Sequence, residues 1–132
     1  DLVLGLGAKD VFPAFADYIK RKYNAEPGFI TMNLPRLKVF LRECGVDNPV
    51  ICSSINKAGY FMNPDMASYE KAIQEGDFRP IAMSVFASGA IRPNDAINYV
   101  CNQSNIQSIV FGASTKKHIE ETVNLIHQYS EL

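Results

Sequence analysis

The chain has 132 residues, of which 47% are hydrophobic and 20% charged, and its formal net charge is -1. These values are typical of a soluble domain that is long enough to bury a core of its own. A net charge so close to zero argues against partners that attract proteins by charge alone, so we expect neither a nucleic acid nor a membrane as a partner.

Two further features of the composition predict a cytoplasmic protein. No apolar run approaches the length of a membrane span, and no signal peptide is visible. The cysteines are odd in number and lack the spacing of metal ligands, as expected for free thiols in a reducing compartment. They are Cys44, Cys52 and Cys101.

Five apolar runs of strand length alternate with helical patterns along the chain. Each run is continuous rather than alternating in polarity, which is typical of strands that are buried on both faces. The predicted strands are Leu2–Leu6, Phe29–Met32, Val50–Ser53, Ile81–Val85 and Ser108–Phe111.

The segments between these runs carry start and stop signals for helices. A short polar side chain precedes most of them, as expected of a residue that caps the first turn. The first two predicted helices are Val11–Tyr23, after Asp10, and Leu34–Cys44, between Asn33 and Gly45. A third runs from Asn63 and Pro64 to about Gln74 and is closed by Gly76, and a fourth starts near Pro93. The last is capped by Ser114 or Thr115, with Ile119, Val123 and Ile126 facing inward.

Five strand–helix units without a long linker predict a single α/β domain with a parallel sheet. Two architectures fit this order: the carboxyl-terminal units of a (β/α)8 TIM barrel, and a flavodoxin-like open parallel sheet with helices on both faces. We favour the barrel units, so residues 1–132 are expected to form one domain that is a fragment of a larger barrel. The abrupt start at Asp1, directly before the first predicted strand, fits this expectation.

Barrel units of this kind leave open sheet edges. Such edges are costly unless another strand or chain covers them. We therefore expect either a homo-oligomer or a missing amino-terminal half of the barrel. A non-catalytic module, whose open sheet serves assembly with another chain, is accordingly one hypothesis for the function.

Two loops of very small residues follow the last two predicted strands, each just before a helix. Such loops expose backbone N–H groups at a helix start, which is what a phosphate group requires. Because the loops belong to adjacent units, we predict that they bind a small phosphate-bearing ligand; plain tight turns between strand and helix are the alternative. His118 in the first turn of the last helix is placed to approach such a ligand, and the alternative for it is an exposed helix residue. The loop residues are Ser88, Gly89 and Ala90 after the fourth strand, and Gly112, Ala113, Ser114 and Thr115 after the fifth.

The run Ile109–Thr115, followed by Lys116–Thr122, resembles the final strand, loop and helix of aldo/keto reductases. In that family the segment binds the adenosine phosphate of NADP(H), so the resemblance implies an oxidoreductase with NADP as its cofactor. It also implies that Ser114 and Thr115 contact the phosphate. The family's catalytic residues come from the first half of its barrel. By position, His118 falls where Gln or Arg is usual, Glu121 where Glu or Gln is usual, and Thr122 where Asn is usual.

Asn56 and Lys57 are the candidates for a reacting group, because they lie just past the carboxyl end of a strand, on the catalytic face of a barrel. A lysine there, desolvated by Tyr60 and Phe61, suits a Schiff base with a carbonyl substrate, as in aldolase-type lyases. A solvated loop lysine is the alternative. For Asn56, both a loop turn and ligand binding stay open. The Asn-Lys-x-Gly segment and the two small-residue loops are also similar to an uncharacterised family of bacterial and archaeal barrel proteins.

Overall fold

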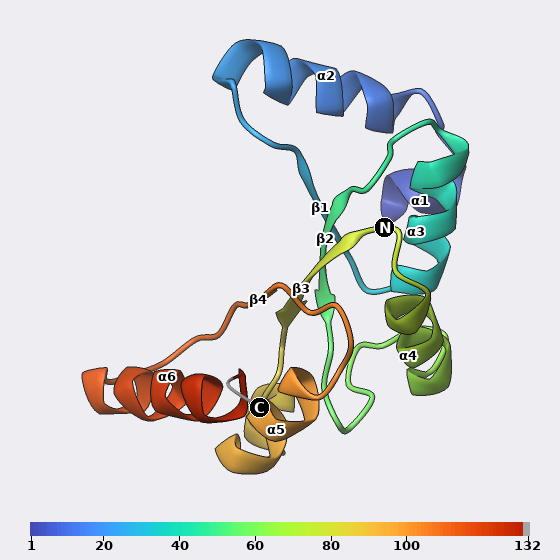
Figure 1. The fold of residues 1–132 in the computed structure, drawn as a ribbon. Helices are drawn as coiled ribbons and strands as arrows, with labels where there is room; N and C mark the ends of the chain where they lie inside the picture. Colours follow the sequence, from blue (N-terminus) through green and yellow to red (C-terminus); the bar gives the residue numbers. More distant parts are fainter. Residues whose placement is uncertain (131–132) are drawn as a thin grey trace.

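The computed structural model describes residues 1–130 and shows an α/β fold with a four-stranded parallel sheet (Figure 1). None of the helices in this range combines the length and apolar character needed to cross a bilayer. In chain order the elements are α1 (Leu2–Leu6), α2 (Val11–Tyr23), β1 (Gly28–Thr31), α3 (Leu34–Glu43), β2 (Val50–Ser54), α4 (Met66–Glu75), β3 (Arg79–Met83), the 3-10 turn η1 (Ala87–Gly89), α5 (Pro93–Cys101), β4 (Ser108–Ile109) and α6 (Lys116–Ser130).

The strands lie side by side in the order in which they occur in the chain. The sheet runs β1-β2-β3-β4, every pair is parallel, and each strand is followed by a helix. One register row joins Ile30 to Cys52, Cys52 to Ile81 and Ile81 to Ser108. Within residues 1–130, β1 and β4 each pair with one strand only, so both edges of the sheet are free.

The two faces of the sheet differ in what covers them. On one face Phe29 packs against Phe12 of α2, with ring centroids 5.8 Å apart, and Ser53 contacts Tyr69 of α4. On the opposite face Ile30 is 66% exposed, and its neighbour Cys52 is only half-buried. The apolar core therefore lies between the sheet and the helices, while the opposite face stays partly open.

The first predicted strand is wrong, because Leu2–Leu6 forms the helix α1. Leu2 and Leu6 are 77% and 74% exposed, and only Leu4 of this helix reaches the core. Gly7 ends the helix in the left-handed conformation, and its N–H donates to the carbonyl of Leu4. A short apolar run has no periodicity that separates a strand from a helix. The Gly5–Gly7 segment consequently ends a helix and does not connect a strand to one.

The other four predicted strands are present, with shifted ends. β3 stops at Met83 because Ser84 has a φ of 54°, which a continuing strand does not allow. β4 is only two residues long and ends at Ile109, before the predicted end at Phe111. Both strands are thus shorter at their carboxyl ends than the apolar runs suggest, which lengthens the loops that follow.

The helices lie close to their predicted ranges, but not every predicted cap forms: the Asp10 side chain makes no capping hydrogen bond to α2. α2 has the predicted bounds, and the Asn33 side chain caps α3 by accepting from the N–H of Arg36 at 3.2 Å. α4 starts later than predicted, because Asp65 and not Asn63 caps it, accepting from the N–H of Ser68 at 2.8 Å. In α6, Ile119 is 47% exposed, so the prediction that it faces inward is wrong.

Candidate ligand-binding site

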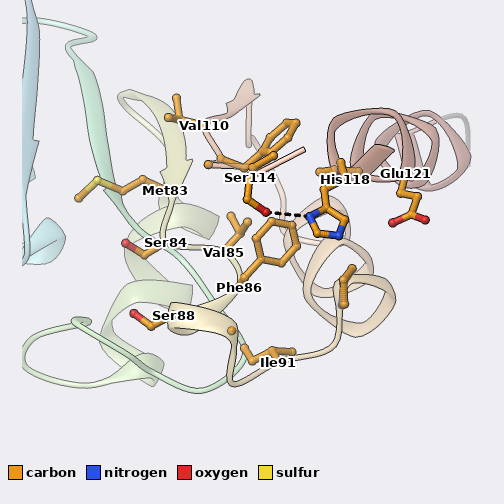
Figure 2. Close-up of a pocket in the computed structure, with 16 residues that line it drawn as sticks. Met83, Ser84, Val85, Phe86, Ser88, Ile91, Val110, Ser114, His118 and Glu121 are labelled. Atoms are coloured by element: carbon orange, nitrogen blue, oxygen red, sulfur yellow. Dashed lines mark hydrogen bonds between the residues drawn. The ribbon is translucent and has the colours of Figure 1, made fainter. Parts of the chain in front are cut away.

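A cavity of about 850 Å³ lies at the carboxyl ends of β3 and β4 and extends to the start of α6 (Figure 2). Two loops form its walls: the loop from β3 to α5, and the loop from β4 to α6. These are the two loops for which the sequence predicts phosphate binding. The main lining residues are Met83, Ser84, Val85, Phe86, Ser88, Gly89, Ile91, Val110, Phe111, Gly112, Ala113, Ser114, His118 and Glu121.

The loop from β4 to α6 brings most of its predicted residues to the cavity. Gly112, Ala113 and Ser114 line it, and Figure 2 shows the Ser114 hydroxyl directed at the ring of His118. The Ser114 Oγ to His118 Nδ1 distance is 3.2 Å. Thr115 lies outside the lining, since its hydroxyl caps α6 by accepting from the N–H of His118 at 3.2 Å. Thr115 therefore positions the helix start and does not face the cavity.

Two backbone donors at the start of α6 are uncommitted. A helix leaves its first N–H groups without intrahelical partners. In α6 the N–H of His118 bonds to the Thr115 side chain, and that of Ile119 bonds to the Thr115 carbonyl at 3.2 Å. Within residues 1–130 the N–H groups of Lys116 and Lys117 have no protein acceptor. Together with the positive end of the helix dipole, these donors make the start of α6 attractive to an anion.

The loop from β3 to α5 lines the cavity with only two of its three predicted residues. Ser88 and Gly89 line the cavity, but Ala90 does not. The N–H of Gly89 donates to the carbonyl of Phe86 at 2.9 Å, and that of Ala90 donates to the carbonyl of Ala87 at 3.1 Å. These two donors are spent inside the loop, so the structure does not bring the two predicted halves together as a paired cradle of free N–H groups.

The backbone of the same loop is unusual at three residues that are not glycine. Ser84, Ala87 and Ser88 have φ angles of 54°, 46° and 55°. Such left-handed conformations cost free energy for residues with a Cβ, and they concentrate at ligand-binding and active sites. The Ser88 hydroxyl donates to the Tyr60 hydroxyl at 3.2 Å, which ties the loop after β2 to the rim of the cavity.

An apolar wall completes the cavity, and the sequence analysis missed it. Met83 and Val110 come from the strand ends and Ile91 from the loop before α5. Phe86 and Phe111 meet edge to face, with ring centroids 6.5 Å apart. Alternate residues of a strand share one face, so the apolar residues at the ends of β3 and β4 indicate such a wall. Assigning them to it requires the true ends of both strands, which the sequence does not show.

Asn56 is completely buried and organises the loop that follows β2. Its Oδ1 accepts from the N–H groups of Ala58 and Tyr60, at 3.2 and 2.9 Å, and its Nδ2 donates to the carbonyl of Tyr60 at 2.9 Å. All its side-chain polar atoms are thus committed to the loop backbone. The structure favours the loop-turn interpretation over a ligand contact.

Lys57 is exposed and does not line the cavity. The predicted desolvation by Tyr60 and Phe61 is not found, because Lys57 is exposed and the two rings lie against each other, with centroids 4.0 Å apart and planes tilted by 41°. A lysine that acts as a nucleophile needs a desolvated pocket or a neighbouring cation to release its proton. The structure provides no observation in favour of a Schiff base at Lys57.

No known protein family, curated protein or solved structure matches the chain significantly. The chemistry of the site therefore has to be argued from its own geometry. The cavity joins an apolar and aromatic wall to a helix start with free backbone donors. This combination suits a ligand that carries both a planar or apolar part and an anionic group.

Proposed function

We propose that the chain binds a small phosphate-bearing ligand in this cavity, with the phosphate at the start of α6. The observation that carries the proposal is the position of the uncommitted N–H groups of Lys116 and Lys117, next to a loop of Gly112, Ala113 and Ser114 that lines the cavity.

The ligand class under this proposal is a nucleotide-type cofactor. The cavity volume of about 850 Å³ lies in the upper range of small-molecule sites and accommodates a large part of a dinucleotide. The aromatic pair Phe86 and Phe111 offers a surface for a planar ring. The resemblance of the last unit to aldo/keto reductases supports a nicotinamide dinucleotide, and hence an enzyme of the oxidoreductase class.

For the architecture we propose consecutive units of a (β/α)8 barrel. Parallel strands in chain order support this arrangement, as does the packing of α2 and α4 against the same face of the sheet. A flavodoxin-like sheet would place some strands out of chain order. The open face and free edges then contact another chain or further units of the barrel. Light scattering of the isolated chain should show a mass that rises with concentration, whereas a monomer at every concentration contradicts self-association.

Substitution at Ser114 tests the ligand proposal. Ser114→Glu places a carboxylate beside the start of α6 and should weaken NADH binding, followed by nucleotide fluorescence, by at least about tenfold. Ser104→Glu is the matched control, because this exposed serine lies before β4, at the other end of the strand. It should change the affinity less than about twofold. The proposal is rejected if the wild-type chain binds neither NADH nor NADPH, or if Ser114→Glu binds NADH as tightly as the wild type does.

A further inference from the structure

The charges around the cavity are unevenly distributed. Glu121 is the single acidic side chain among the described lining residues, and neither lysine nor arginine lines the cavity. In Figure 2, Glu121 lies further along α6 than His118, away from Ser114. The helix start at one end of the cavity thus favours an anion, whereas the carboxylate of Glu121, beyond His118, repels one.

The nearby lysines do not compensate for this carboxylate inside the cavity. Lys116 and Lys117 project into solvent, with side chains 88% and 81% exposed. They pair along the helix with Glu120 and Glu121, at 3.5 and 3.7 Å. Pairs of this kind on an exposed helix surface are weak and are screened by salt. A second phosphate group near Glu121 would accordingly meet a negative charge without a fixed cation of its own.

His118 does not present the planar fork of donors with which an arginine holds a phosphate. Its ring is also engaged through Nδ1 by the Ser114 hydroxyl at 3.2 Å. In doubly wound dinucleotide-binding folds, an acidic side chain accepts from the free ribose 2′-hydroxyl, whereas an arginine accommodates a 2′-phosphate. The same charge argument applies to a carboxylate that faces this position in another fold.

We infer that the cavity takes dinucleotides of the NAD type and discriminates against those that carry a 2′-phosphate. This inference rests on the proposed function and narrows its ligand class. The pyrophosphate uses the start of α6, while neutral donors of the ligand, such as ribose hydroxyls or an amino group, face Glu121. The 2′-phosphate of NADP would instead be repelled by the carboxylate. The inference therefore favours NAD, which lacks this group, over the NADP that the family resemblance implies.

Two charge reversals on neighbouring residues test the inference. Glu121→Lys and Glu120→Lys are matched, since both residues are exposed and each breaks one Lys–Glu pair of α6, but only Glu121 lines the cavity. Dissociation constants for NADH and NADPH are measured by nucleotide fluorescence for the wild type and both variants. Circular dichroism establishes that each variant keeps its helix content.

The wild type should bind NADH at least about tenfold more tightly than NADPH, and Glu121→Lys should reduce or invert this ratio by a similar factor. Glu120→Lys should leave the ratio within about twofold of the wild type. Tighter or equal binding of NADPH by the wild type overturns the inference alone, as does a ratio that Glu121→Lys does not change. If the wild type binds neither nucleotide, the proposed function fails and the inference falls with it.

Discussion

The hydroxyl of Tyr69 in α4 lies 3.1 Å from the hydroxyl of Ser53 in β2, and both side chains are completely buried. The Ser53 hydroxyl donates to the carbonyl of Thr31 at 2.7 Å, and the Tyr69 oxygen accepts from the N–H of Leu34 at 3.1 Å. The Tyr69 O–H therefore donates to Ser53. Burial raises the pKa of Tyr69, so its hydroxyl stays protonated as a donor. This chain of bonds joins α4, β2, β1 and the start of α3.

Removing the Tyr69 hydroxyl should destabilise the fold. In Tyr69→Phe the N–H of Leu34 stays buried without an acceptor, and leaving such a group unpaired costs about 1–3 kcal/mol. Urea denaturation followed by circular dichroism measures the free energy of unfolding. A variant as stable as the wild type would show that the buried bond contributes nothing.

Two adjacent serines should respond in opposite ways to alanine. The Ser54 hydroxyl is buried and lacks a hydrogen-bond partner among residues 1–130, whereas that of Ser53 is fully bonded. Ser54→Ala should leave the free energy of unfolding unchanged or raise it by up to about 1 kcal/mol, because it removes an unpaired polar group. Ser53→Ala, the matched control, should lower it by about 1–3 kcal/mol. Equal losses in both variants would contradict this distinction.

The loop after β2 should depend on Asn56 and not on Lys57. Asn56→Ala removes three hydrogen bonds to the loop backbone and should lower the free energy of unfolding by about 1–3 kcal/mol. Lys57→Ala at the exposed neighbour should change it by less than about 0.5 kcal/mol. Thermal denaturation compares the two. Borohydride treatment with carbonyl compounds should give no adduct on Lys57, and a specific adduct there would restore the lyase hypothesis.

Two glutamates should make the protein less stable in acid. The hydrogen bond from Lys38 lowers the pKa of Glu75, and the hydrogen bond from Arg79 lowers that of Glu26. A carboxyl group with a lowered pKa in the folded state stabilises above its ordinary pKa, and this stabilisation is lost as the pH falls through the lowered value. The double variant Glu26→Gln and Glu75→Gln should therefore lose less melting temperature than the wild type between about pH 7 and pH 3. Identical losses would argue against both bonds.

Local signals predicted much of this fold. α2 has its predicted bounds, although Asp10 does not cap it with its side chain. Asn33 caps α3 as expected, because capping depends on residues adjacent in the chain. α1 was missed because five apolar residues fit a strand or a helix equally well. The conformation of Ser84, which ends β3, depends on tertiary contacts that a single sequence does not report.

The cavity lies at the two loops for which the sequence predicts ligand binding, but its lining differs in detail from the predicted residues. Gly112, Ala113 and Ser114 line it, and a helix start without bulky side chains has a recognisable composition. Asn56 could not be assigned, because its role depends on which backbone groups surround it in the folded loop. The charge of the lining, on which the proposed ligand discrimination rests, could not be predicted either, because the sequence does not show that Glu121 lines the cavity and that Lys116 does not.

The central claim is that the start of α6 holds a phosphate, and a nuclear magnetic resonance titration tests it at the residues concerned. Backbone amide signals of the 14.7 kDa chain are followed while NADH is added. The account predicts that the amides of Lys116 and Lys117 show the largest saturable shifts, and that adenosine, which lacks phosphate, leaves them nearly unchanged. An absence of saturable shifts at these two amides, or equal shifts with adenosine, would contradict it.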